Sequence, residues 1–204
     1  PILGIEDNIL SSMLDILSNE FSISDFYDKA PKEIITYIWE TTYKSVCNDA
    51  IIVGDKYNEY LLQLETLKQI YPFARYIFIY RNGKDAAESM VRQFNGRAYV
   101  PRNYEEAFTK WAQWNSCWLD IRDSILSANK LEICYEDFVS NPVQTFIDIG
   151  QFLDIDISRN MKQDILKTIH QTAVGSGEKI DIDYDVVKKG VPEYLNVLHA
   201  LGYK

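Results

Sequence analysis

The chain is poor in the residues that mark disulfide-linked proteins, zinc proteins and phosphate-loop kinases. Its three cysteines share no Cys-x-x-Cys spacing, and their odd count predicts neither a disulfide framework nor a zinc site. We therefore expect a reducing compartment, the cytoplasm. No Gly-Lys-Ser or Gly-Lys-Thr occurs to hold phosphate and Mg²⁺, which argues against a phosphate-loop kinase. The two histidines, His170 and His199, fall in expected late helices, where a packed or solvated imidazole explains them.

Positive charge and long apolar runs are scarce as well. The formal net charge is -9, with 21 Lys and Arg against 30 Asp and Glu. Nucleic acids and anionic membranes are bound chiefly through clustered basic residues, so we expect neither as a partner, although a local basic pocket stays possible. No apolar run approaches the ~20 residues of a membrane helix. At 204 residues and 47% hydrophobic, the chain suits a single domain over residues 1–204.

Strand-like and helix-like patterns alternate along the sequence. Apolar residues at helical spacing predict helices over 8–19, 32–47, 57–70, 83–95, 104–127, 142–153, 158–170 and 185–200. Short β-favouring runs predict strands at 50–54, 76–80 and 131–135. This alternation implies a central parallel sheet and an α/β three-layer sandwich, in which ligands bind at the carboxyl ends of the strands.

Arg81 stands at the end of the strand predicted over 76–80, where the next helix begins. The N-terminus of a helix has free N–H groups and a positive dipole end, and it favours anions. Asp85 and Ser89 share the helix face opposite the apolar stripe. A guanidinium fork and a hydroxyl are suitable donors for phosphate. Taken alone, the same residues also suit an ordinary polar surface. This segment by itself therefore leaves two interpretations open, a phosphate site and a solvated helix face.

Three segments, in this order along the chain, resemble motifs of the sulfotransferase family. The run Arg81-Asn-x-x-Asp85-x-x-x-Ser89 after an apolar strand resembles the family's 3′-phosphate-binding segment. Downstream, Tyr135-Glu-Asp-Phe with a Pro-started helix after it looks like the family's Tyr-Glu-Asp-Leu strand end. Upstream, Gly54-Asp-Lys resembles the Gly-Asp-Lys-Thr-Pro of the branch that includes many bacterial members and the protein-tyrosine sulfotransferases. Tyr-Asn replaces its Thr-Pro here.

The resemblance implies 3′-phosphoadenosine 5′-phosphosulfate (PAPS) as co-substrate and 3′,5′-bisphosphoadenosine (PAP) as product. It assigns the 3′-phosphate to Arg81 and Ser89 and a nucleotide contact to Tyr135. Ser176 and Lys179 would close over the same phosphate. Lys56 would stabilise the charge that develops on the leaving phosphate, and Glu6, in Gly-Ile-Glu, would deprotonate the acceptor. A core tyrosine, a surface lysine and a first-turn glutamate remain the ordinary alternatives for Tyr135, Lys56 and Glu6.

The largest departure from the family is a missing motif. Sulfotransferases hold the 5′-phosphosulfate in a Pro-x-x-Gly-Thr-Thr-type loop, and this sequence contains none; Gly175-Ser-Gly177 lacks the phosphate-loop spacing. We expect an N-terminally incomplete domain with the P-loop NTPase-like sulfotransferase fold. It would transfer a sulfuryl group from PAPS, without metal, to a hydroxyl or amine of a small-molecule, carbohydrate or peptide acceptor. The alternative is a non-catalytic nucleotide- or protein-binding module on that fold.

Overall fold

The computed structural model describes residues 40, 50, 52–93, 96, 100–169, 174–179, 187 and 189–203. The chain divides into two compact units, one of residues 1–57 and 66–72 and the other of residues 58–65 and 73–204. The second unit contains the sheet, its crossover helices and most of the predicted site. Among the described residues, no helix combines the length and the apolar character that a membrane span needs.

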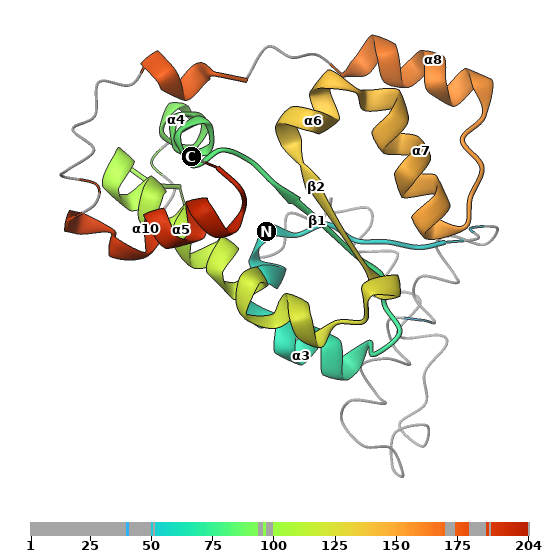
Figure 1. Ribbon diagram of the computed structural model, residues 1–204, viewed down its shortest axis with the longest axis horizontal. Helices are drawn as coiled ribbons and strands as arrows, with labels where there is room; N and C mark the ends of the chain where they lie inside the picture. Colours follow the sequence, from blue (N-terminus) through green and yellow to red (C-terminus); the bar gives the residue numbers. More distant parts are fainter. Residues whose placement is uncertain are drawn as a thin grey trace. The chain divides into compact units, whose positions relative to one another are not determined.

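Two parallel strands form the sheet in the described part of the chain. Strand β1 spans Tyr76–Tyr80 and β2 spans Lys130–Cys134, with Tyr76 opposite Lys130 and Tyr80 opposite Cys134. Figure 1 shows the two strands running side by side. Because the strands are parallel, their carboxyl ends, Tyr80 and Cys134, lie at the same edge, which is where a ligand is expected.

The helices between the two strands, together with the last helix of the chain, form one layer that encloses the main core. Helix α4 spans Gly83–Arg92, α5 spans Tyr104–Ile121, and α10, Pro192–Ala200, packs against α5. The side chains of Asn82 and Asn103 accept hydrogen bonds from the first turns of α4 and α5, as asparagine caps do. In the core, Phe78 stacks on Trp118 with ring centroids 4.7 Å apart.

A second layer of helices follows β2. Helix α6 spans Tyr135–Ser140, α7 spans Pro142–Leu153 and α8 spans Arg159–Thr168. Proline at the first position of α7 and the Ser158 cap of α8 confirm the expected helix starts. Figure 1 shows α6, α7 and α8 on the opposite side of the strand pair from α4, α5 and α10. The predicted α/β fold with a parallel sheet between helical layers is confirmed.

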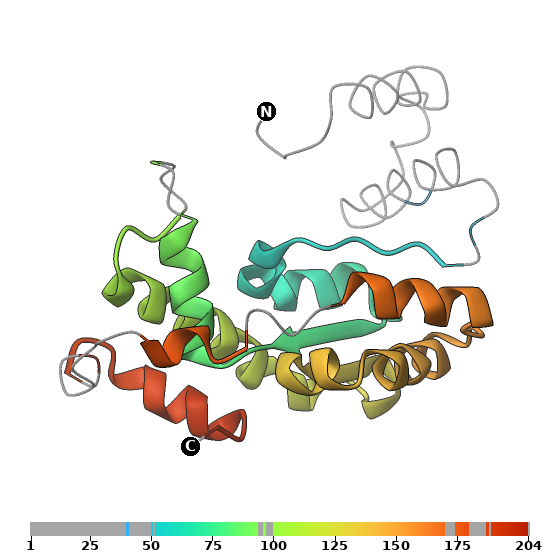
Figure 2. The same cartoon turned by 90° about the horizontal axis from the view of Figure 1, so that it is seen from above.

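Short 3₁₀ and helical segments complete the described elements. They are η2 (Asn58–Gln63), α3 (Leu64–Ile70), η3 (Arg122–Ser124), η4 (Ser127–Asn129) and η5 (Ser176–Lys179). In Figures 1 and 2 η5 lies beside α4, which brings the C-terminal part of the chain to the carboxyl end of β1.

Several predicted element boundaries were wrong. Residues 50 and 52–54 form no strand, and Ile52 and Val53 are exposed. Their composition favours a strand, but no partner strand pairs with them among the described residues. The helix expected over 57–70 begins as 3₁₀ helix, and the one expected over 104–127 ends at Ile121. The last helix is interrupted before Pro192, because proline has no N–H to continue it. Except for Glu40, which is helical, the helices expected over 8–19 and 32–47 lie outside the described residues.

Candidate functional site

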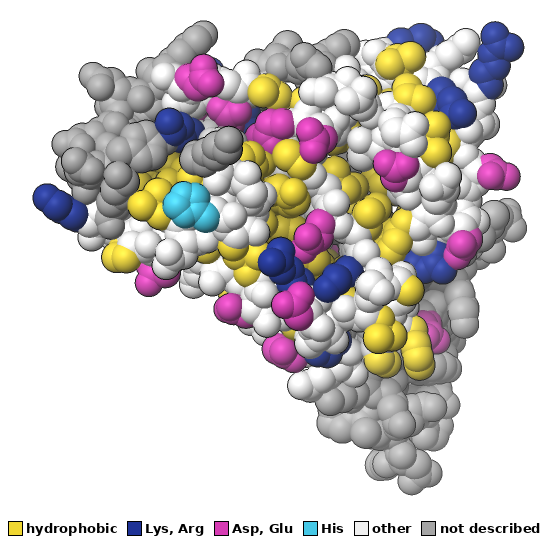
Figure 3. Space-filling model, in the orientation of Figure 1, with side chains coloured by type: hydrophobic (Ala, Val, Ile, Leu, Met, Phe, Trp, Pro, Cys, Tyr) yellow, Lys and Arg dark blue, Asp and Glu magenta, His cyan; other side chains and the backbone are white. Residues whose placement is uncertain are grey.

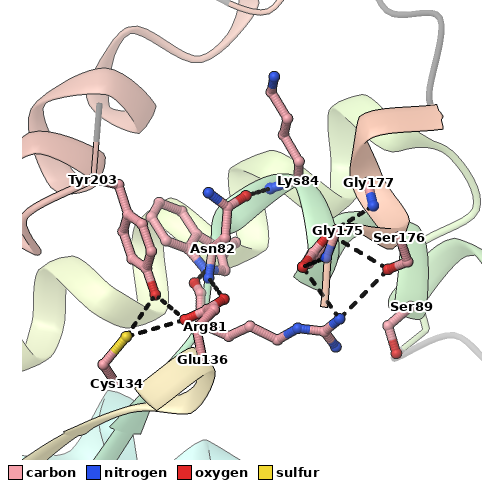
Figure 4. Close-up of polar contacts among 12 residues, drawn as sticks. Arg81, Asn82, Lys84, Ser89, Cys134, Glu136, Gly175, Ser176, Gly177 and Tyr203 are labelled. Atoms are coloured by element: carbon pink, nitrogen blue, oxygen red, sulfur yellow. Dashed lines mark hydrogen bonds and ion pairs between the residues drawn. The ribbon is translucent and has the colours of Figure 1, made fainter. Parts of the chain in front are cut away.

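Arg81, directly after β1, is held in place from several sides. The indole Nε1 of Trp111 donates to the Arg81 carbonyl oxygen at 3.0 Å, which ties the strand end to α5. The guanidinium lies 4.8 Å from the centroid of the Tyr135 ring and is 18% exposed. Its Nη2 is 3.4 Å from the Ser176 hydroxyl and 3.6 Å from the Asp85 carboxylate (Figure 4). The result is a positioned cationic fork at the edge of the sheet.

Ser176 reaches Arg81 from a segment 95 positions away in the sequence. It begins η5, which packs on the first turn of α4. A Cβ added to Gly177 would stand 2.4 Å from the Lys84 carbonyl carbon, so only glycine permits this close approach. Gly175 has φ +75°, in the left-handed region that glycine favours. Ser176 thus lies beside Arg81, and the two glycines explain how the chain brings it there.

Two further predicted nucleotide-binding residues lie in the same unit. Ser89 is on α4 one turn beyond Asp85, on the same helix face, and its hydroxyl accepts from Gln93 Nε2 at 3.4 Å. Tyr135 was predicted as the last residue of a strand, but it is the first residue of α6, immediately after β2. The structure thus brings Arg81, Tyr135 and Ser176 into contact at the carboxyl edge of the sheet, with Ser89 on the adjoining helix.

The remaining predicted site residues lie in the first unit or have side chains outside the described part of the chain. Lys56 belongs to the first unit, in an exposed stretch without helix or strand, and its amide donates to the Asp55 carboxylate at 2.7 Å. Glu6 lies outside the described residues, as does the side chain of Lys179. Their roles stay predictions.

Sequence reasoning missed the role of Asp85, which was placed on a polar helix face. It is 4% exposed, and its carboxylate accepts hydrogen bonds from the amides of Gly175 at 2.8 Å and Gly177 at 2.6 Å. The only available signal was its spacing of four residues from Arg81. An acidic residue in the first turn of a helix has an ordinary dipole explanation, so that signal was weak.

Glu136 was also missed, and it joins three segments near the site. Its carboxylate accepts from the Asn82 amide at 3.0 Å, from the Tyr203 hydroxyl at 2.6 Å and from the Cys134 thiol at 3.1 Å (Figure 4). Burial raises the pKa of Glu136, but the hydrogen bonds donated by Tyr203, Asn82 and Cys134 outweigh it, and the pKa lies below its usual range. Burial and the bond to Glu136 raise the pKa of Tyr203.

A cavity of about 560 Å³ adjoins the first turn of α4. Its lining includes Asn82, Lys84 and Asp85 from the α4 start, Glu136 from α6, and Tyr194 and Tyr203 from the C-terminal region. Its volume is within the range of small-ligand pockets. Figure 3 shows basic side chains interspersed with acidic ones on the face drawn there, with no broad basic patch among the residues it colours.

The chain is similar to known sulfotransferases. The model of the sulfotransferase family matches residues 12–159, more than half of the chain. A protein-tyrosine sulfotransferase-like protein of Caenorhabditis elegans is 24% identical over 175 residues, covering 83% of this chain and 61% of its own. Protein-tyrosine sulfotransferase A of the same organism is 28% identical over 90 residues, covering 44% of this chain and 24% of its own. The chain thus spans less than two thirds of these relatives.

Solved structures show the same fold. The sulfotransferase domain from the curacin biosynthetic pathway aligns with a TM-score of 0.57 and 18% identity, over 85% of this chain and 68% of that one. The sulfotransferase domain from the Synechococcus PCC 7002 olefin synthase aligns with a TM-score of 0.58 and 16% identity, over 100% of this chain and 78% of that one. The family match and the shared fold lead to one conclusion: the chain belongs to the sulfotransferase family.

Proposed function

We propose that the protein transfers a sulfuryl group from PAPS to an acceptor hydroxyl or amine. The observation that carries the proposal is the convergence of Arg81, Ser176 and Tyr135 where the two parallel strands end. This edge is the ligand-binding edge of open α/β sheets. A cationic fork, a hydroxyl and an aromatic ring there match the needs of a phosphorylated nucleotide.

The residues present fit the 3′-phosphate end of the co-substrate. The Arg81 guanidinium offers paired N–H donors, and the hydroxyl of Ser176 adjoins it at 3.4 Å. Ser89 adds a second hydroxyl from α4. The Tyr135 ring limits the directions in which the guanidinium can turn, because the two lie 4.8 Å apart. The site therefore binds a dianion through directional donors and not through net charge, in a chain of charge -9.

The chemistry of the proposed reaction needs two more groups. The co-substrate supplies the sulfuryl group and leaves as a bisphosphate. Lys56 stabilises the negative charge that develops on the leaving oxygen, and Glu6 removes the proton of the acceptor as it attacks. Both assignments rest on the motifs Gly54-Asp-Lys56 and Gly4-Ile-Glu6.

For the acceptor, we propose a tyrosine hydroxyl in a peptide or protein. The support is that both Caenorhabditis relatives carry names of the protein-tyrosine sulfotransferase type. A direct assay is transfer of labelled sulfuryl group from PAPS to a tyrosine-containing peptide by the full-length protein, with the phenylalanine version of the same peptide as control.

Nucleotide binding tests the proposal independently of the acceptor. In isothermal titration of the full-length protein with PAP, we expect Arg81→Ala to weaken binding by about ten- to hundredfold, since a charge-assisted hydrogen bond is lost. The matched control is Arg75→Ala. Arg75 is half-exposed and pairs with Asp154 and the Phe152 carbonyl, away from the site.

The control separates loss of the site from loss of an arginine in general. We expect Arg75→Ala to bind PAP as the unmodified protein does. Absence of PAP binding in the unmodified protein, or equal affinity in the Arg81 variant, would remove the nucleotide assignment.

A further inference from the structure

Asp85 is a buried acidic residue beside a site that should attract anions. It stands in the first turn of α4 with 4% of its surface exposed, and its carboxylate lies 3.6 Å from the Arg81 guanidinium. A negative charge at this position opposes the binding of a phosphate by ordinary electrostatics. Its presence therefore needs a structural benefit that outweighs this repulsion.

The carboxylate organises the segment that carries Ser176. One of its oxygens accepts from the Gly177 amide at 2.6 Å and the other from the Gly175 amide at 2.8 Å, on either side of Ser176. The Ser176 hydroxyl is 3.5 Å from the first of these oxygens and 3.4 Å from Arg81. The two glycine amides, the Ser176 hydroxyl and the Arg81 guanidinium therefore all adjoin this carboxylate. Figure 4 shows Gly175, Ser176 and Gly177 grouped near the end of the Arg81 side chain.

The packing of the segment leaves little freedom for another arrangement. Gly177 touches the backbone between Lys84 and Asp85 so closely that a Cβ would be 2.6 Å from the Asp85 nitrogen. Gly175 supplies the left-handed turn that aims the amides at the carboxylate. Two charge-assisted bonds from backbone donors are directional, and together they orient the residue between them.

We infer that Asp85 is a positioning residue, which holds residues 174–178 against α4 so that the Ser176 hydroxyl stands beside Arg81 and completes the grip on the 3′-phosphate. The inference rests on the proposed function, because it assigns the phosphate to that site. Asp85 itself does not touch the ligand; it acts through Ser176.

The sign of the effect of Asp85→Asn decides between positioning and electrostatics. Asparagine has nearly the same shape but only one acceptor oxygen, so one of the two glycine amides loses its partner. If Asp85 positions Ser176, PAP affinity falls by at least about tenfold. If Asp85 only moderates the charge of Arg81, its neutralisation strengthens PAP binding instead.

The experiment is isothermal titration of the full-length protein and its Asp85→Asn variant with PAP and with adenosine 5′-phosphate, which lacks the 3′-phosphate. We expect the variant to lose affinity for PAP alone. Its affinity for adenosine 5′-phosphate should change less than about twofold, since the carboxylate acts through a 3′-phosphate contact. Unchanged or tighter PAP binding overturns the inference. An equal loss for both nucleotides overturns it too, because general damage to the fold would act on both.

A double-mutant cycle adds a test of the route through Ser176. Ser176→Ala weakens PAP binding in the unmodified protein and has almost no further effect on the Asp85→Asn background, because coupled residues are not additive. Additive losses overturn the inference. If Asp85→Asn does not fold, Gly177→Ala displaces the segment with the carboxylate intact, and it should produce the same selective loss for PAP.

The outcomes distinguish the two proposals. Absence of PAP binding in the unmodified protein overturns the proposed function and the inference with it. Normal PAP binding in the unmodified protein together with no loss in the Asp85→Asn variant overturns the inference alone.

Discussion

At the scale of single residues, the proposed site depends on how Arg81 is restrained. Its carbonyl oxygen is bound by Trp111, its guanidinium faces the Tyr135 ring, and Ser176 and Asp85 adjoin its Nη2. A long side chain loses conformational freedom when it binds an anion, and earlier restraint reduces that loss. Trp111 and the Tyr135 ring therefore restrain Arg81 before any ligand binds.

The catalytic role of Glu6 is a prediction at the same scale. We expect Glu6→Gln to leave PAP affinity unchanged and to lower kcat by about 10² to 10⁴-fold, because general base catalysis typically contributes that much. The measurement is the steady-state rate of sulfuryl transfer to a tyrosine-containing peptide. Glu193→Gln, a change at an exposed position of α10, serves as the matched control and should leave kcat unaltered. A kcat for Glu6→Gln equal to that of the control would exclude Glu6 as the base.

At the scale of elements, Glu136 ties the start of α6 to two other segments. The Asn82 amide, just before α4, and the Tyr203 hydroxyl, just after α10, both donate to its carboxylate. The Cys134 thiol donates as well. One carboxylate therefore joins the ends of β1 and β2 to the C-terminal segment, next to the residues that hold Arg81.

This connection predicts a pH dependence of stability. Hydrogen bonds keep the Glu136 pKa below its ordinary value of 4.5, so the stabilisation is present above about pH 4.5 and is lost as the pH falls through the folded pKa. The Tyr203 pKa is raised above 10.0. The stabilisation that comes from the Tyr203 hydrogen bond is therefore present below pH 10 and is lost as the pH rises further. The contribution is therefore greatest between these two limits.

The variant Tyr203→Phe tests this window. We expect it to lower the free energy of unfolding by about 1–3 kcal/mol near pH 7, because a partly buried carboxylate loses a donor. The difference from the unmodified protein should shrink below pH 4.5 and above pH 10. Urea unfolding over a series of pH values measures it; a difference that is constant with pH would show that Tyr203 contributes by packing alone.

At the scale of the whole molecule, the second unit depends on an aromatic core under the strands. Trp118 is 1% exposed, stacks on Phe78 and donates from its indole Nε1 to Glu132 on β2 at 2.5 Å. It thus contacts both strands from α5. Tyr194 of α10 packs on Phe108 and Trp111 of α5, which brings the C-terminal helix into this core.

We expect Trp118→Ala to destabilise the protein by about 3–5 kcal/mol, the usual cost of removing a large buried aromatic side chain. The matched control is Trp114→Ala on the same helix, where the indole is only partly buried and lies 4.3 Å from the Lys110 ammonium. Its loss should cost about 1 kcal/mol. Chemical denaturation measures both, and equal costs would contradict the assignment of the core.

Much of the architecture follows from local patterns in the sequence. The apolar runs over 76–80 and 131–135 predicted β1 and β2 within one residue, and the Asn-Pro pair predicted the start of α7. The run over 50–54 has the same β-favouring composition, but its described residues form no strand. A strand needs hydrogen-bonding partners from elsewhere in the chain, and composition does not reveal whether they are present.

The sequence by itself determined the alternation of strands and helices, the family resemblance and the place of Arg81 at a strand end. Only the tertiary structure decided that Asp85 is buried, that Gly177 must be glycine and that Glu136 joins three segments. The physical reason is sequence distance. The Asp85 bonds span 90 and 92 positions and the Glu136–Tyr203 bond spans 67, so these contacts exist only after the helices have packed.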